Sequence, residues 1–195
     1  MTLGLFGGTF DPIHNGHLKV ANIVMSIFNL DQIMFVPAGM PYLKNDIDVS
    51  PSQHRYKMVE LAIHSNKKFK VSDMEINRSG PSYTIDTVQN IERQGVKPVV
   101  IFGLDVINKM DRWHNSTKVL KECEIIVVSR PNESALILND VIKTDENWLN
   151  IKHVEIDTPN ISSTDIRNRI KQGKSIDCLV PQSIKSYIIK NQLYK

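Results

Sequence analysis

Cysteine is scarce in this sequence, and long hydrophobic runs are absent. Only two cysteines occur among the 195 residues, with no C-x-x-C pair. That number supports neither a disulfide framework nor a zinc site, and it suits a reducing cytoplasm. No apolar run approaches the roughly 18 residues of a membrane-spanning helix, and no basic segment followed by an apolar one indicates a signal peptide. We therefore expect a cytoplasmic protein with no membrane partner.

The chain also lacks a strong excess of charge of either sign. Its 24 Lys and Arg residues against 21 Asp and Glu residues give a formal net charge of +3. This excess is too small to indicate nucleic-acid binding through bulk charge. The length suits one well-packed domain and is short for two. We expect a single domain over residues 1–195 and no nucleic-acid partner, and the sequence leaves open whether the chain forms a homo-oligomer.

Short β-branched or apolar runs alternate with longer amphipathic segments. The strand candidates are Leu3–Phe6, Gln32–Val36, Lys70–Ser72, Val99–Phe102, Ile125–Val128 and Lys152–Ile156. The helix candidates are Leu18–Phe28, Pro51–Ser65, Ile85–Gln94, Ser116–Lys121, Glu133–Val141, Thr164–Gln172 and Gln182–Asn191. This alternation predicts an α/β fold with a Rossmann-like, doubly wound parallel sheet, helices on both faces and a C-terminal helical segment.

Local signals mark several helix boundaries. Ser50, Pro51 and Gln53 fit an N-cap, a first helical position and a capping box. Gly95 and Gly173 follow periodic segments and suit left-handed helix ends. We therefore expect helices to begin or end at these residues, and Pro181 to open the last helix.

Residues 7–17 (GGTFDPIHNGH) lie where a predicted strand ends and a predicted helix begins. The stretch gathers the amides of Gly7 and Gly8, a helix N-terminus and the imidazoles of His14 and His17. All of these favour negative charge, so the stretch predicts a polyphosphate site. In an open parallel sheet, ligands bind beyond the carboxyl ends of strands where the strand order reverses. A second predicted strand also ends in glycine, at Gly103, and we expect these two strand ends to border the site.

The histidines have other interpretations, since they could cap the helix, lie in the core or bind a metal. Two histidines three residues apart make a poor zinc site, because H-E-x-x-H places its ligands four apart. Neither the P-loop pattern G-x-x-x-x-G-K-S/T nor the Rossmann pattern G-x-G-x-x-G is present. The strand and the glycines that precede the histidines favour phosphate binding.

Further motifs follow in order along the chain. They are residues 80–84 (GPSYT), residues 103–105 (GLD), Trp113, residues 161–167 (ISSTDIR), residues 180–181 (VP) and residues 187–188 (YI). With the first motif, they make the chain resemble the bacterial nicotinate-nucleotide adenylyltransferases, a family of the nucleotidyltransferase superfamily. The superfamily shares its His-x-Gly-His element with class I aminoacyl-tRNA synthetases. The resemblance covers essentially the whole chain, whereas either end alone would identify only the superfamily.

The resemblance implies an activity and its partners. The family transfers the adenylyl group of ATP to nicotinate mononucleotide and forms deamido-NAD and pyrophosphate in NAD biosynthesis. Mg²⁺ is expected on the triphosphate, held mostly by phosphate and water and not by a metal site of the protein. The attacking phosphate is already an anion near neutral pH, since its second pKa is about 6. The chemistry therefore needs positioning and charge stabilisation, without a general base or a covalent nucleophile.

The resemblance also assigns roles to individual residues. It implies that the catalytic residues are His14, His17 and Arg167. The implied ATP-binding residues are Gly7, Gly8, Thr9, Phe10, His14, His17, Gly103, Asp105, Ile161, Ser163, Thr164 and Arg167. The implied mononucleotide-binding residues are Lys44, Tyr83, Thr84 and Trp113, with Trp113 stacked on the pyridine ring.

Several of these residues have structural interpretations as well. Arg167 could be a solvated helix residue or form a surface ion pair. Asp105 and Thr84 could be helix N-caps, and Trp113 could belong to the core. The loop 41–44 departs from the family pattern Pro-Pro-His-Lys, because Tyr42 and Leu43 replace a proline and a histidine. Lys44 is kept, but the conformation of this loop stays open.

Two rival functions fit the first motif. Pantetheine-phosphate adenylyltransferases share it, but residues 80–84 and 162–167 argue against that acceptor. A nucleotide sensor without activity would most easily have lost His17 or Arg167, and both are present. The sequence therefore favours a mononucleotide adenylyltransferase.

Overall fold

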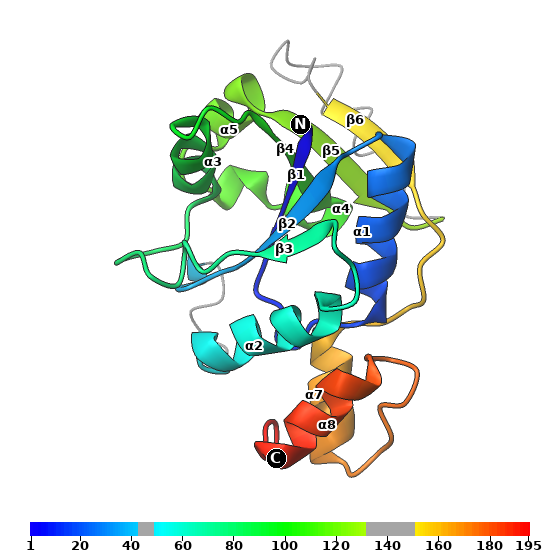
Figure 1. Cartoon of the computed structure of the whole chain (residues 1–195). Coiled ribbons are helices and arrows are strands. Elements are labelled where there is room, and N and C mark those ends of the chain that lie inside the picture. The colour runs from blue at the N-terminus through cyan, green and yellow to red at the C-terminus, as the bar shows by residue number, and fades with distance from the viewer. Residues whose placement is uncertain (43–48, 132–150) are drawn as a thin grey trace.

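A parallel sheet of six strands forms the centre of the molecule in the computed structural model, which describes residues 1–42, 49–131 and 151–195. Its strands are β1 (Leu3–Gly8), β2 (Gln32–Pro37), β3 (Phe69–Val71), β4 (Pro98–Gly103), β5 (Glu124–Ser129) and β6 (Ile151–Glu155). They lie in the order β3-β2-β1-β4-β5-β6, and every neighbouring pair is parallel. Each predicted strand overlaps an observed one, so the predicted doubly wound parallel sheet is confirmed (Figure 1).

Helices connect the strands and cover both faces of the sheet. They are α1 (Asn15–Ile27), α2 (Ser52–Ile63), α3 (Thr84–Glu92), α4 (Leu104–Ile107), the 3₁₀ helix η2 (Met110–Arg112), α5 (Ser116–Glu122), α7 (Ser163–Lys171) and α8 (Gln182–Lys190). In Figure 1, α1 lies on one side of the sheet and α3 and α5 lie on the other, with α7 and α8 below α2. None of the described helices is long and apolar enough to cross a membrane.

Two apolar cores follow from the alternation of side chains along the strands. Phe6 belongs to the core beneath α1 and α2, whereas Leu5 belongs to the core beneath α3 and α5. Buried members of the first core include Val24, Phe35, Met58, Ile166 and Ile184. Buried members of the second core include Val88, Val100, Val119 and Val127. Because α7 and α8 contribute Ile166 and Ile184 to the first core, the C-terminal helices pack as part of the same body as the sheet.

The strand order reverses between β1 and β4, and these two strands separate toward their carboxyl ends. Their pairing runs only from Leu3↔Pro98 to Leu5↔Val100. Beyond it, β1 continues beside β2 as far as Gly8, and β4 continues beside β5 as far as Gly103. The two glycine ends therefore border the switch point, which is where ligands bind in open α/β sheets.

The predicted helix boundaries had mixed outcomes. Gly95 and Gly173 have φ of +81° and +66°, which confirms the left-handed helix ends, and α8 begins directly after Pro181. The predicted capping box at α2 is wrong, because Pro51 is the N-cap residue and no side chain caps the helix. Ser50 instead donates its backbone N–H to the carboxylate of Asp11. The predicted helix Glu133–Val141 lies outside the described residues.

Candidate active site

The histidines of the first motif stand at the start of α1, where each caps the backbone of the other. His14 is the N-cap residue, and His17 lies in the first turn of the helix. The His17 N–H donates to Nδ1 of His14 at 3.4 Å, and the His14 N–H donates to Nδ1 of His17 at 3.3 Å. The rings stack, with centroids 3.6 Å apart. The capping interpretation is therefore correct, and it is compatible with phosphate binding through Nε2.

This capping box determines which ring nitrogen carries the proton. A nitrogen that accepts from a backbone N–H has no proton of its own, so a neutral ring carries its proton on Nε2. His14 is only 6% exposed. Burial, aided by the nearby charge of Arg130, lowers the pKa of His14 from 6.5 to about 4. Near pH 7, His14 is therefore neutral and has an Nε2–H group available as a donor.

Gly16 lies between the two histidines in sequence, where a side chain would crowd the ring of His14. A Cβ at Gly16 would lie 3.0 Å from Nδ1 of His14, which is closer than ordinary van der Waals contact. The preceding Asn15 anchors the same turn, because its backbone N–H donates to the Leu179 carbonyl and its side chain donates to the Cys178 carbonyl. These contacts give the His-x-Gly-His spacing a structural reason.

The second motif, at the start of α7, contacts the first one directly. The Ser163 hydroxyl donates to the carbonyl of Pro12 at 2.9 Å, and the Arg167 guanidinium donates to the carbonyl of Asp11 at 2.8 Å. Arg167 also donates to the Thr164 hydroxyl. The structural interpretation of Arg167 as a merely solvated residue is therefore wrong. Residues from opposite ends of the chain are therefore in direct contact.

Sequence reasoning missed Arg55, which is 1% exposed and holds three loops together. Its guanidinium donates to the carbonyls of Thr9 at 2.9 Å, Ser50 at 2.9 Å and Gly39 at 3.3 Å. Burial lowers the pKa of Arg55, while the negative charge of Asp11 raises it, and an arginine stays charged at such a site. A signal existed, because Arg55 shares the buried face of α2 with Met58 and Val59 at helical spacing.

A second cation that the sequence interpretation missed, Arg130, follows the end of β5. It donates to the side chain of Asn160 at 3.0 Å and to the carbonyl of Ile161 at 3.3 Å, and its charge reaches His14. Ile161 itself is 4% exposed and packs in the core. Any part that Ile161 plays in binding ATP would therefore use its backbone.

The remaining residues of the stretch 7–17 that the sequence assigns to ATP lie at the end of β1. Gly7 is exposed, and a Cβ there would meet nothing within 4 Å, so its backbone is open to a ligand. Thr9 accepts from Arg55 through its carbonyl. Phe10 has φ of +50°, an uncommon value for a residue other than glycine. Its buried ring packs edge-on against His17, with centroids 5.1 Å apart.

Aromatic side chains gather where α3 begins. The ring of Tyr83 stacks on His114, with centroids 4.2 Å apart, and the edge of Tyr42 packs on Tyr83 at 4.9 Å. The Tyr42 hydroxyl accepts from the His114 N–H at 3.3 Å. Tyr42, which replaces the family's proline, thus joins the segments that follow β2 and β4. Leu43 and Lys44 lie outside the described residues.

Two N-cap interpretations of the predicted site residues are wrong. Tyr83 is the N-cap residue of α3, so Thr84 is the first residue of the helix. Gly103 is the N-cap residue of α4, so Asp105 lies within its first turn. The Asp105 carboxylate instead lies against Gly103, 2.6 Å from the position of a Cβ there. A side chain at residue 103 would collide with this carboxylate.

The core interpretation of Trp113 is correct in part, because its partly buried ring packs against the second core. Trp113 packs edge-on against Phe102, with centroids 5.1 Å apart and an interplanar angle of 89°. Its Nε1–H is buried and has no hydrogen-bond partner among the described residues. A buried donor without a partner is costly, so this N–H is a candidate contact for a ligand.

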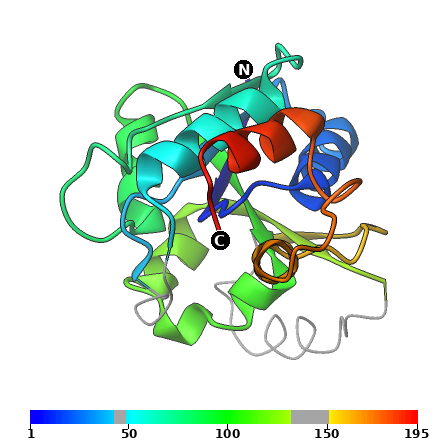
Figure 2. The same cartoon turned by 90° about the horizontal axis from the view of Figure 1, so that it is seen from below.

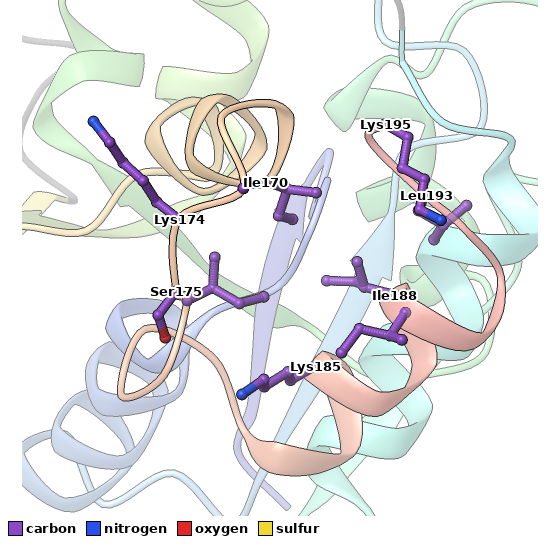
Figure 3. A pocket seen from close by; sticks show the side chains of 10 residues that line it. Ile170, Lys174, Ser175, Lys185, Ile188, Leu193 and Lys195 are labelled. Atoms are coloured by element: carbon purple, nitrogen blue, oxygen red, sulfur yellow. The ribbon is translucent and has the colours of Figure 1, made fainter.

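A hollow of about 210 Å³ lies apart from these residues, between α7 and α8 (Figure 3). It is lined by Ile170, Gly173, Lys174, Ser175, Ile176, Lys185, Ile188, Ile189, Leu193 and Lys195. Its walls are mainly aliphatic, and no residue that the sequence assigns to ATP or the mononucleotide lines it.

Comparison with known proteins places the chain in a family. The chain matches the model of the Cytidylyltransferase-like family over residues 5–169. A Thermoanaerobacter protein named "Probable nicotinate-nucleotide adenylyltransferase" is 40% identical over 200 residues, which cover 100% of this chain and 95% of the relative. A Corynebacterium kroppenstedtii protein of the same name is 38% identical, over 98% of this chain and 90% of the relative.

Solved structures include chains of the same fold. The nicotinic acid mononucleotide adenylyltransferase of Plasmodium falciparum, complexed with NaAD, matches with a TM-score of 0.80. The match covers 99% of this chain and 97% of that chain at 22% identity. Likeness at this identity shows the fold, and it agrees with the sheet order described above.

The buried, neutral His14 predicts a pH dependence of stability. In the unfolded chain its pKa is near 6.5, whereas in the folded chain it is about 4. The unfolded state therefore binds more protons in this window, and His14 lowers the free energy of unfolding as the pH falls from 6.5 toward 4. His14→Asn keeps a good N-cap without a titrating ring. Urea titrations at several pH values measure how steeply the free energy of unfolding changes with pH. This slope should be smaller in His14→Asn than in the wild-type protein by up to ~1.4 kcal/mol per pH unit. Equal slopes in the two proteins would contradict the assignment.

Replacement of the buried Arg55 should destabilise the folded chain strongly. Arg55→Met should leave three part-buried carbonyls without this donor and remove a cation whose charge interacts with Asp11. We expect the free energy of unfolding to fall by about 3–5 kcal/mol. Lys57→Met, on the exposed side of the same helix, should change it by less than about 0.5 kcal/mol. Denaturant unfolding of both variants checks this, and a loss for Arg55→Met no larger than that of Lys57→Met would refute the role.

Proposed function

The chain belongs to the Cytidylyltransferase-like family and, within it, to the nicotinate-nucleotide adenylyltransferases, and we propose that it transfers the adenylyl group of ATP to nicotinate mononucleotide. The products are deamido-NAD and pyrophosphate, and the reaction belongs to NAD biosynthesis. The observation that supports this function most strongly is the contact between the two motifs. Ser163 and Arg167 donate to the backbone of Pro12 and Asp11, just before the histidine pair.

The proposed reaction is an in-line displacement at phosphorus. A 5′-phosphate oxygen of the mononucleotide attacks the α-phosphorus of ATP, and the bond from that phosphorus to the β-phosphate oxygen breaks. Pyrophosphate leaves with the electron pair of that bond. The attacking phosphate has a second pKa of about 6, so no side chain has to remove a proton from it. The task of the protein is to align the reactants and stabilise negative charge.

The residues at the tip of β1 have the chemistry for this task. The Nε2–H groups of His14 and His17 can donate to α- and β-phosphate oxygens, and Arg167 adds a permanent cation with several donors. The N-termini of α1 and α7 contribute aligned backbone dipoles that favour phosphate. Donors held in place before the reaction stabilise developing charge without reorganisation. We assign ATP to this region, with Gly103 and Asp105 on its border at β4.

We assign nicotinate mononucleotide to the aromatic side of the switch point. Trp113 has a buried Nε1–H without a described partner, and Tyr83 lies where α3 begins. The dipole of α3 favours a carboxylate over an amide at Thr84, which supports the acid as the acceptor. Lys44, whose placement lies outside the described residues, stays a predicted contact to the mononucleotide phosphate.

Mg²⁺ enters this proposal as a companion of ATP. Among the described residues, no three His, Cys, Asp or Glu side chains form a group that could hold a metal ion. We propose that Mg²⁺ binds with ATP and is held mostly by phosphate oxygens and water, as is usual for nucleotide substrates. When bound, it would neutralise phosphate charge.

The location and the domain organisation are also proposals. We propose that residues 1–195 act as one domain, because α7 and α8 pack into the same core as the sheet. We propose a cytoplasmic location as well, in keeping with the reaction and with two cysteines that are both unpaired, Cys123 and Cys178.

An acceptor panel tests the function directly. Purified protein is supplied with Mg²⁺-ATP and either nicotinate mononucleotide, nicotinamide mononucleotide or phosphopantetheine, and pyrophosphate release is measured. We expect the highest kcat/KM with nicotinate mononucleotide and deamido-NAD as its product. Preference for phosphopantetheine, or binding of nucleotide without turnover, would refute the proposal.

His17 is expected to act on the reacting phosphate. His17→Ala should lower kcat roughly 10²-fold or more, as the loss of a transition-state contact does. It also removes one half of the capping box, so His17→Gln is the matched control, because glutamine in this position can still reach the N-cap N–H. The melting temperature of His17→Gln should lie closer to the wild-type value than that of His17→Ala. The kcat of His17→Gln should nevertheless also be far below the wild-type kcat. Near-normal turnover in either variant would count against the role.

Tyr83 is expected to act on the acceptor alone. Tyr83→Ala should raise the KM for the mononucleotide by roughly 10-fold, because aromatic stacking contributes about 1–1.5 kcal/mol. The KM for ATP should stay near the wild-type value. Steady-state kinetics with each substrate varied in turn checks this, and a rise confined to the ATP KM would reverse the assignment of the two sides.

A further inference from the structure

The segment after α8 turns back and contacts the stretch of residues 7–17 near the N-terminal end of the chain. The Tyr194 hydroxyl donates to Oδ1 of Asp11 at 2.6 Å, across 183 positions of sequence. Two left-handed residues shape this turn, Gln192 with φ of +53° and Tyr194 with φ of +66°. Figure 2 shows the red C-terminal segment ending beside the blue turn that follows β1.

Apolar packing and a backbone hydrogen bond hold the segment just before Tyr194. Leu193 packs against the first core and donates its backbone N–H to the Ile188 carbonyl at 3.1 Å. Leu193 and Lys195 both line the hollow between α7 and α8 (Figure 3). Tyr194, between them in sequence, faces Asp11 instead. The hydroxyl is therefore held toward the carboxylate by contacts that do not involve it.

Asp11 is the residue through which this contact can reach the site. Its side chain is 2% exposed. Oδ2 accepts from the Ser50 N–H at 3.2 Å, and the backbone carbonyl accepts from Arg167 at 2.8 Å. Tyr194 thus holds the carboxylate of the same residue whose carbonyl holds Arg167. Three positions further along the chain, His14 begins the capping box.

We propose that Tyr194 is a positioning residue for adenylyl transfer, which fixes the turn at Asp11 so that the histidine pair and Arg167 face the same triphosphate. The inference rests on the proposed function of the site. The hydroxyl can serve as a permanent donor, since burial, the charge of Asp11 and the hydrogen bond to it all raise the pKa of Tyr194. Loss of the hydroxyl would leave Oδ1 of the buried Asp11 carboxylate without this donor, while Oδ2 would keep the hydrogen bond from the Ser50 N–H.

This role predicts that loss of the Tyr194 hydroxyl affects the use of ATP and not the binding of the mononucleotide. Asp11 and Tyr194 lie on the side of the sheet covered by α1 and α2, with Phe10 and Ile13 in that core. Tyr83 and Trp113 pack against the opposite core. A loss of position at Asp11 should therefore change kcat and the KM for ATP, and it should spare the KM for the mononucleotide. A general loss of structure would affect both substrates alike.

Tyr194→Phe tests the proposal, with Tyr187→Phe as its matched control. The Tyr187 hydroxyl lies 2.9 Å from Nδ1 of His54 and joins α8 to α2, so its loss also removes a tyrosine hydroxyl contact of the same region. We expect Tyr194→Phe to lower kcat about 10-fold and to raise the KM for ATP, because small misplacements of catalytic groups lower rates strongly. The KM for the mononucleotide should stay within about twofold, and Tyr187→Phe should keep the wild-type kcat.

The outcomes separate this inference from the proposed function. If the wild-type protein makes no deamido-NAD, the proposed function fails. If it does, and Tyr194→Phe keeps wild-type kinetics or raises both KM values equally, only the inference fails. If the melting temperature of Tyr194→Phe lies well below that of Tyr187→Phe, a further variant, Tyr194→His, is measured, because histidine supplies a hydrogen-bond donor at this position. Recovery of kcat in that variant supports positioning, and a kcat as low as that of Tyr194→Phe overturns it.

Discussion

Two hydrogen bonds join the start of α7 to the turn after β1, and the candidate site depends on them. Ser163 donates to the carbonyl of Pro12, and Arg167 donates to the carbonyl of Asp11. These contacts hold the Arg167 guanidinium against the turn that leads into the histidine pair. The carbonyls can accept them because the turn leaves the sheet at Gly8, and none of the described strands pairs with it. The backbone carbonyls of this turn thus accept hydrogen bonds from side chains of the other end of the chain.

The electrostatics of the site follow from burial and capping. A buried histidine at a helix N-terminus is disfavoured in its charged form, both by desolvation and by the helix dipole. The cost is avoided at His14 because the ring stays neutral and its Nδ1 satisfies a backbone N–H of the first turn. Permanent positive charge is supplied instead by three arginines. Arg55 donates to the carbonyl of Thr9, Arg130 donates to the carbonyl of Ile161, and Arg167 donates to the carbonyl of Asp11. The neutral donor His14 and the permanently charged arginines are therefore separate groups in this site.

Much of the fold could be predicted, because it follows from patterns that the chain repeats. Apolar runs alternating with amphipathic segments predict parallel strands and helices, and glycines at strand ends mark the point where β1 and β4 separate. The helix boundary at Ser50 could not be predicted from local signals, because Asp11, far away in sequence, takes its backbone N–H. Arg55 and Tyr194 were missed for the same reason. Their partners are backbone carbonyls and a carboxylate in distant loops, and no short motif encodes those contacts.

The most direct test of the central claim is a crystal structure of this chain with Mg²⁺ and a non-hydrolysable ATP analogue. The account predicts phosphate oxygens at hydrogen-bond distance, about 3 Å, from Nε2 of the histidine pair and, in the same complex, from the Arg167 guanidinium. A triphosphate that contacts only one of the two motifs, or one that binds in the lysine-flanked hollow between α7 and α8, would contradict it.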